Sequence, residues 1–152
     1  MESVTTLNKD TIKGIQNLIE INIDSSKGFE EAAEKVENNA IADLFRTCAS
    51  ERRTYANDLQ SLAIVNAKEP KTDGTWKGTV HRWWIDLRGS IQSGDEHAML
   101  AEAERGEDAI KHRYEDTLKD TAGSAVNDVL QRQYAGVKAR HDQIRDMRDA
   151  RA

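Results

Sequence analysis

The stretch that decides the fold is residues 29–62, FEEAAEKVENNAIADLFRTCASERRTYANDLQSL. Apolar side chains recur along it at intervals that fit one face of an α-helix. These positions are Phe29, Ala33, Val36, Ala40, Leu44, Cys48, Tyr55, Leu59 and Leu62. The stretch therefore predicts a long amphipathic helix, and Glu51 stands at the one turn where an apolar residue is missing.

Helical spacing continues upstream of this stretch. Isoleucines and leucines over residues 4–23 predict a first helix. We expect the segment 24–28, DSSKG, to be a tight turn, because Glu30 and Glu31 would then lie favourably in the first turn of the second helix. That second helix would extend to about residue 65 and measure about 60 Å, unless it bends at Asn38-Asn39.

Downstream, residues 66–75 form the only long break in the pattern, with Pro70 and the turn signal Asp73-Gly74. A shorter helix is predicted over 76–87, with two bulky residues, Trp83 and Trp84, side by side. Two glycines punctuate its end, Gly89 and Gly94.

Two further long helices follow. Ser93 and Glu96 have the spacing of a capping box, in which each side chain satisfies a backbone donor at the start of a helix. Gly123 is expected to end this third long helix, and Ser124 to cap the fourth. The inner face of the fourth helix is predicted to carry Val126, Leu130, Gln133, Val137, His141 and Ile144.

These elements predict an all-α fold in a single domain, residues 1–152. Two short loops join the first pair and the last pair of long helices, whereas nearly the whole of 66–95 separates the second from the third. A long crossover between the second and third helices is typical of the ferritin-like four-helix bundle, here with an extra short helix in the crossover. The alternative is an up-down-up-down bundle with a helical insertion, in which the second and third long helices would be antiparallel.

The composition narrows the classes of function. The net charge of −5 and the mixed charges do not favour nucleic-acid binding, which requires a basic surface. No apolar run is long enough to span a membrane and no signal-peptide core is found, so we expect a cytoplasmic protein. The basic residues near the C-terminus alternate with aspartates and are expected to form a solvated face, namely Lys138, Arg140, Arg145, Arg148 and Arg151.

Polar residues on the apolar faces are the candidates for chemistry. Di-metal bundles use Glu-x-x-His pairs, which place two ligands one turn apart on one helix face, and this sequence has no such pair. Glu104, Glu107 and His141 remain as candidate ligands for iron or manganese, because Glu104 and His141 are expected at the same height. The alternative is that His141 is a hydrogen-bonded core histidine and that Glu51 pairs with a nearby arginine or a neighbouring helix.

Buried rather than reactive roles are predicted for the remaining residues of interest. Cys48 is the only cysteine and lies on the apolar stripe, which indicates a small buried side chain. Tyr55 and Tyr114 are expected to be core aromatics whose hydroxyl groups are hydrogen-bonded. We find no catalytic triad, phosphate-binding loop or zinc-binding spacing.

Two structural roles are possible for the adjacent tryptophans of the short helix. Trp83 and Trp84 could fasten the short helix to the bundle. Adjacent residues on a helix point about 100° apart, however, so we expect one of the two to be exposed and to join a two-fold homodimer contact.

Several motifs together resemble those of an uncharacterised bacterial family grouped as a domain of unknown function. They are Asp24-x-x-x-Gly28-Phe29-x-x-Ala32-Ala33, Glu51-Arg52, His81-Arg82-x-Trp84-x-Asp86-Leu87 and Glu104-Arg105-Gly106-Glu107-Asp108. The resemblance covers roughly residues 7–141 and implies a ferritin-like, distantly rubrerythrin-like bundle in a bacterial cytoplasm. It implies no established activity. We therefore expect a non-enzymatic, stress-associated structural or interaction protein without a cofactor, and a metal-binding protein with an oxidative-stress role is the alternative.

Overall fold

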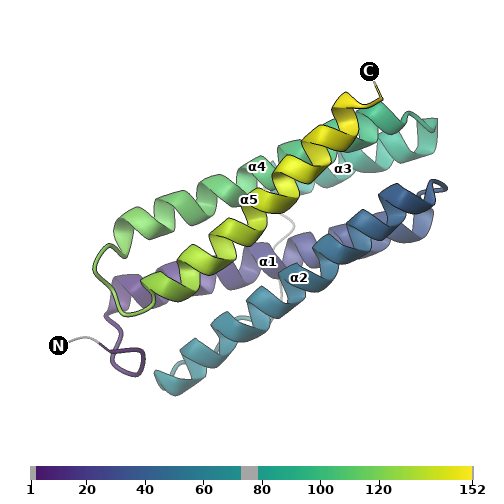
Figure 1. Cartoon of the computed structure of the whole chain (residues 1–152). Helices are drawn as coiled ribbons and strands as arrows, with labels where there is room; N and C mark the ends of the chain where they lie inside the picture. Colours follow the sequence, from purple (N-terminus) through teal and green to yellow (C-terminus); the bar gives the residue numbers. More distant parts are fainter. Residues whose placement is uncertain (1–2, 73–78, 152) are drawn as a thin grey trace.

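The computed structural model describes residues 3–72 and 79–151, which contain five α-helices and no strand (Figure 1). The helices are α1 (Lys9–Lys35), α2 (Asn39–Val65), α3 (Thr79–Ser93), α4 (Glu96–Asp120) and α5 (Asn127–Asp149). The prediction of an all-α fold is thereby confirmed. The predicted turn at Asp73-Gly74 and the start of the predicted short helix at 76–78 lie outside the described residues. Within the described residues, no helix combines the length and the apolar character needed to cross a membrane.

The position predicted for the first turn is wrong. Helix α1 continues through 24–28 and ends at Lys35, and α2 begins after Asn38, whose side chain accepts a hydrogen bond from the Ile41 N–H at 3.1 Å. The hydroxyl groups of Ser25 and Ser26 donate to the carbonyl oxygens of Asn22 and Ala49, so these polar groups are satisfied within a helical backbone. The small residues of this segment therefore allow close helix packing instead of forming a turn.

The remaining helix ends follow the predictions in part. Helix α3 passes through Gly89 and ends before Gly94, which has a φ of +75°, in the left-handed region that glycine adopts without strain. Asp95, and not Ser93, caps α4 by accepting a hydrogen bond from the Ala98 N–H at 3.0 Å. Ser124 does not cap α5, because the helix begins at Asn127.

The direction of each long helix follows from its contacts. Short connections, residues 36–38 and 121–126, make α1 antiparallel to α2 and α4 antiparallel to α5. Helix α5 is also antiparallel to α2, because Glu51 pairs with Arg140 while the Tyr55 carbonyl oxygen contacts the Gln133 side chain. Helices α2 and α4 therefore point the same way, as their colours show in Figure 1, and α3 packs against α1 and α4.

The interior contains two apolar clusters and a polar pair between them. One cluster is centred on Phe29, Phe45, Trp83, Trp84 and Leu100, and the other on Leu18, Leu59, Tyr114, Leu130 and Val137. Arg52 and Glu107 are fully buried and fall between the two clusters along α2 and α4. A charged pair thus occupies the middle of the bundle.

The expected exposed tryptophan is not found. Trp83 and Trp84 are only 4% and 5% exposed, because α3 is packed against two helices at once. The Trp83 ring lies 5.4 Å from the Phe29 ring, centroid to centroid, and packs so closely on Gly106 that a Cβ there would lie 2.2 Å from it. The two rings fasten α3 to the bundle, and the argument for a dimer through them is lost.

Candidate functional site

The buried pair of Arg52 and Glu107 joins α2 to α4 at the centre of the molecule. The Arg52 Nη2 donates to Glu107 Oε2, and neither side chain has any exposure to solvent. The Arg52 guanidinium also lies over the Tyr55 ring, 5.6 Å from its centroid. Arg52 Nε, Arg52 Nη1 and Glu107 Oε1 have no hydrogen-bond partner among the described residues. The pair is therefore held in place but incompletely satisfied.

Burial and charge act in opposite directions on this pair. Burial raises the pKa of Glu107 above its usual range, although the Arg52 cation favours the ionised carboxylate. For Arg52, burial favours the neutral form and lowers the pKa. The Glu107 carboxylate and other nearby side chains favour the cation more strongly, so the pKa of the guanidinium is raised overall. Burial also raises the pKa of the adjacent Cys48 thiol, followed by the effect of Glu107, so this thiol stays protonated and poorly reactive. The predicted burial of Cys48 is confirmed.

Two further predictions for buried polar residues can be compared with the structure. The Tyr114 hydroxyl donates to Gln133 Oε1 at 2.7 Å and accepts from Asn22 Nδ2 at 2.8 Å, as expected for a hydrogen-bonded core tyrosine. Glu51 lies at the partly exposed edge of α2 and accepts hydrogen bonds from Arg140 of α5, including two from Arg140 Nε at 3.0 Å. Glu51 is thus held by a neighbouring helix.

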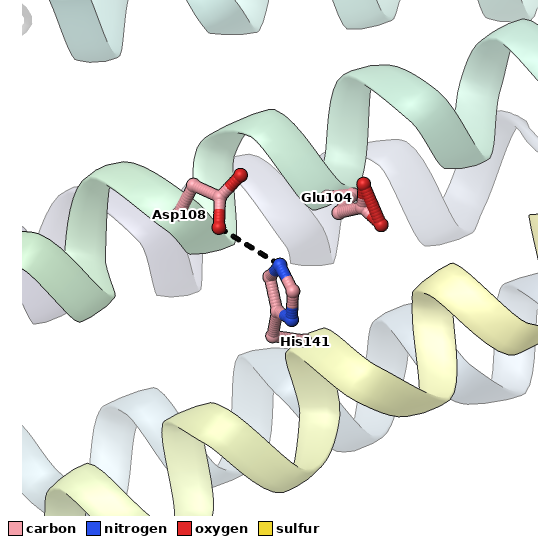
Figure 2. Close-up of side chains that lie close together, drawn as sticks. All are labelled: Glu104, Asp108 and His141. Carbon is pink, nitrogen blue, oxygen red and sulfur yellow. Dashed lines mark ion pairs between the residues drawn. The ribbon is translucent and has the colours of Figure 1, made fainter.

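A second polar group lies on the α4–α5 side of the bundle and comprises Glu104, Asp108 and His141 (Figure 2). The His141 Nε2 lies 2.8 Å from Asp108 Oδ1, and its Nδ1 lies 3.0 Å from Asp142 Oδ1. One ligand atom from each of Glu104, Asp108 and His141 lies within 4.8 Å of the other two. The side chains of His141 and Glu104 are 12% and 15% exposed, whereas that of Asp108 is 43% exposed, so solvent reaches the group from the Asp108 side.

The structure brings together two of the three predicted metal ligands. Glu104 and His141 are close, as their expected equal height suggested, but Glu107 faces Arg52 in the interior. Asp108 takes the third place because residues four apart on a helix share a face, whereas Glu107 is turned towards α2. The sequence signal for Asp108 is its i, i+4 spacing from Glu104, which places both carboxylates on one face of α4.

The C-terminal arginines are not all on a solvated face, contrary to expectation. Arg148 pairs with Glu104 across α4 and α5, and Arg151 Nε donates to Glu96 at 3.0 Å. Lys138, which is exposed, and Arg145, which pairs with aspartates of its own helix, fit the prediction. Arg148 therefore already neutralises the Glu104 carboxylate in the group of Glu104, Asp108 and His141.

The sequence of residues 10–120 matches the family model of DUF2383, a domain of unknown function. The chain belongs to the DUF2383 family. No curated protein matches the chain. The DUF2383 match includes Arg52, Glu107, Glu104 and Asp108 but ends before α5. The central ion pair consequently lies wholly inside the DUF2383 region, whereas His141 lies outside it.

The group of Glu104, Asp108 and His141 has two possible hydrogen-bonding arrangements, one for a protonated and one for a neutral His141 imidazole. An ionised carboxylate only accepts hydrogen bonds, so a protonated imidazole would donate to Asp108 and Asp142 at once. A neutral imidazole that donates through Nδ1 to Asp142 would instead present the Nε2 lone pair to Asp108 and Glu104. That second arrangement is the one that orients a histidine for a metal ion.

Proposed function

We propose that this DUF2383 protein is a ferritin-like helical bundle that serves as a structural or interaction protein and not as an enzyme. The ferritin-like assignment is supported by two antiparallel helix pairs, by the long connection that carries α3, and by α2 and α4 pointing the same way. We also propose that the protein is stress-associated, and this part of the proposal is supported by the family resemblance alone.

The observation that carries the proposal is the Arg52–Glu107 pair at the centre of the bundle. Di-metal bundles place carboxylates of several helices around cations at this depth. Here the positive charge comes from a guanidinium of the chain itself, and a metal ion beside it would be repelled strongly in a poorly solvated interior. An interior closed in this way leaves the outer helix faces as the surfaces through which the protein acts.

Elemental analysis tests the proposal. The protein would be purified without an affinity tag or chelator, analysed for iron and manganese, and then mixed with Fe²⁺ in air while oxygen consumption is followed. We expect less than stoichiometric metal and no protein-dependent oxidation. Two tightly held metal ions per chain, or catalytic oxidation of Fe²⁺, would overturn the proposal.

A second candidate function is the binding of one divalent cation by Glu104, Asp108 and His141. The observation that favours it is the convergence of two carboxylates and one imidazole from α4 and α5, with Asp142 placed to orient the imidazole. Carboxylate and imidazole ligands suit manganese and ferrous iron. Because Arg148 forms an ion pair with Glu104, a cation would have to compete with this guanidinium for the Glu104 carboxylate.

Calorimetric titration with Mn²⁺ separates the two candidates. If the cation binds at this group, Asp108→Asn and His141→Ala will abolish the binding heat, and Arg148→Gln will strengthen binding by removing the competitor. Asp146→Asn on α5, the helix of His141, is the matched control, because this exposed aspartate has Arg145 as its only ion-pair partner among the described residues. Absence of binding to the native protein, or equal binding by all variants, would eliminate the second candidate.

A further inference from the structure

A charged groove runs between the exposed sides of α1 and α2. It has a volume of about 450 Å³, and its floor is formed by Ala33 of α1 and Ala49 of α2. Small side chains at the floor leave the two helix ridges standing above it. In Figure 1 the α1–α2 pair forms one side of the molecule, and α3, α4 and α5 form the other.

The two walls of the groove carry opposite charge. The α1 wall presents Glu30 and Glu34, and the α2 wall presents Arg46 and Arg53. The charges are only partly matched among the residues that the structure describes: Arg53 pairs with Glu30 at 2.9 Å, whereas Arg46 pairs there only with Asp43 of its own helix. Glu34 has no ion pair among the described residues.

We propose that the α1–α2 groove is a homodimer interface on which a second copy of this chain docks. The proposal rests on the proposed function as an interaction protein and names its partner. A two-fold axis parallel to the helices would place α1 of one copy opposite α2 of the other. The acidic wall of each copy then faces the basic wall of its partner, and the contact is made twice.

Charge complementarity selects both the partner and the symmetry. A two-fold axis lying across the helices would instead place acidic wall on acidic wall, which is repulsive. A partner must carry an acidic and a basic ridge in the reverse order, and a second copy related by the parallel axis presents that order. The aliphatic stems of Arg46 and Arg53 can lie over the alanine floor while their charged ends reach the facing glutamates.

A charge-reversal experiment tests this interface. Arg46→Glu makes the facing walls of its homodimer mainly acidic, and Glu34→Arg makes them mainly basic, so each variant alone should dimerise at least about tenfold more weakly than the native chain. An equimolar mixture of the two variants restores opposite charges at both symmetric contacts. We therefore expect the mixture to form a heterodimer, detected by sedimentation equilibrium with one variant fluorescently labelled.

The control is Lys138→Glu on α5, which makes the same change in net charge as Arg46→Glu on an exposed residue outside the groove. It should leave the dimer intact. A native chain that is monomeric at the highest concentration reached, or a mixture that remains monomeric, would overturn the proposal. A metal-free monomer would remove only this interface, whereas stoichiometric interior metal would remove the proposed function itself.

Discussion

Replacing Arg52 with methionine leaves Glu107 as an unpaired carboxylate in the interior of the bundle. Both side chains are fully buried, and breaking such a pair by removing one partner costs about 3–5 kcal/mol of folding free energy. Glu107→Met should cost a similar amount, because it leaves a guanidinium that stays protonated and buried. The double variant should lose far less, since apolar side chains of similar volume replace a buried pair at little cost and often with a gain.

The unsatisfied atoms of the pair strengthen this expectation. Arg52 Nε, Arg52 Nη1 and Glu107 Oε1 have no hydrogen-bond partner among the described residues, and each buried polar group left unpaired costs about 1–3 kcal/mol. The double variant removes these atoms together with the pair. Its stability should therefore fall within about 2 kcal/mol of the native value, or exceed it, which makes the coupling energy between the two positions several kcal/mol.

Urea unfolding followed by circular dichroism measures these differences, and urea is preferred because guanidinium could occupy the space left by Arg52. The pH dependence separates the two single variants. Burial already raises the pKa of Glu107, and loss of Arg52 raises it further, so protonation favours the folded Arg52→Met variant and its deficit shrinks as the pH falls. The Glu107→Met variant has no such relief. Single losses below about 1 kcal/mol, or simple additivity in the double variant, would refute the reasoning.

Two further predictions concern packing and surface charge. Gly106→Ala should destabilise the protein by more than about 1 kcal/mol, because its Cβ would lie 2.2 Å from Trp83, whereas Gly89→Ala, with no atom within 4 Å, should be neutral or stabilising by about 0.5–1 kcal/mol in thermal unfolding. The Tyr134 hydroxyl donates to Glu115 at 2.6 Å and lowers the pKa of that carboxyl. Tyr134→Phe should therefore cost stability above the usual pKa of glutamate, and the difference should vanish as the pH falls through the lowered value; an equal loss at pH 3 and pH 7 would contradict this.

The helices themselves could be predicted from sequence because the period of the apolar residues is a local property. The first turn could not, because Asp24, Ser25 and Ser26 have turn-like character only in isolation. In the structure all three are buried in α1, where contacts with other helices override local propensity. Asn38-Asn39, at which the sequence analysis allows only a bend, contains the residue that caps the start of α2, because the Asn38 side chain accepts a hydrogen bond from the Ile41 N–H.

The candidate site could be predicted only in part, because its contacts join distant parts of the chain. Glu104 and His141 could be expected at the same height, since a single short loop joins α4 to α5, and the structure places them together. It could not assign faces, and a rotation of about 100° between adjacent helical residues separates Glu107 in the interior from Asp108 on the α5 side. The pairing of Arg52 with Glu107, 55 residues apart, required the relative placement of two helix pairs that no local pattern supplies.

The two polar groups of the bundle differ in which ligand they can accept, and this difference decides where function should be sought. At the centre, Arg52 provides the positive charge that Glu107 requires, so an added cation would meet repulsion and find one carboxylate already engaged. On the α4–α5 side, Arg148 engages Glu104 from a partly exposed position, and His141 stands between two aspartates. A guanidinium at the surface can move aside into water at little cost, whereas a buried one cannot. We therefore expect any bound cation to exchange on the α4–α5 side. The Arg52–Glu107 pair at the centre instead joins the two helix pairs.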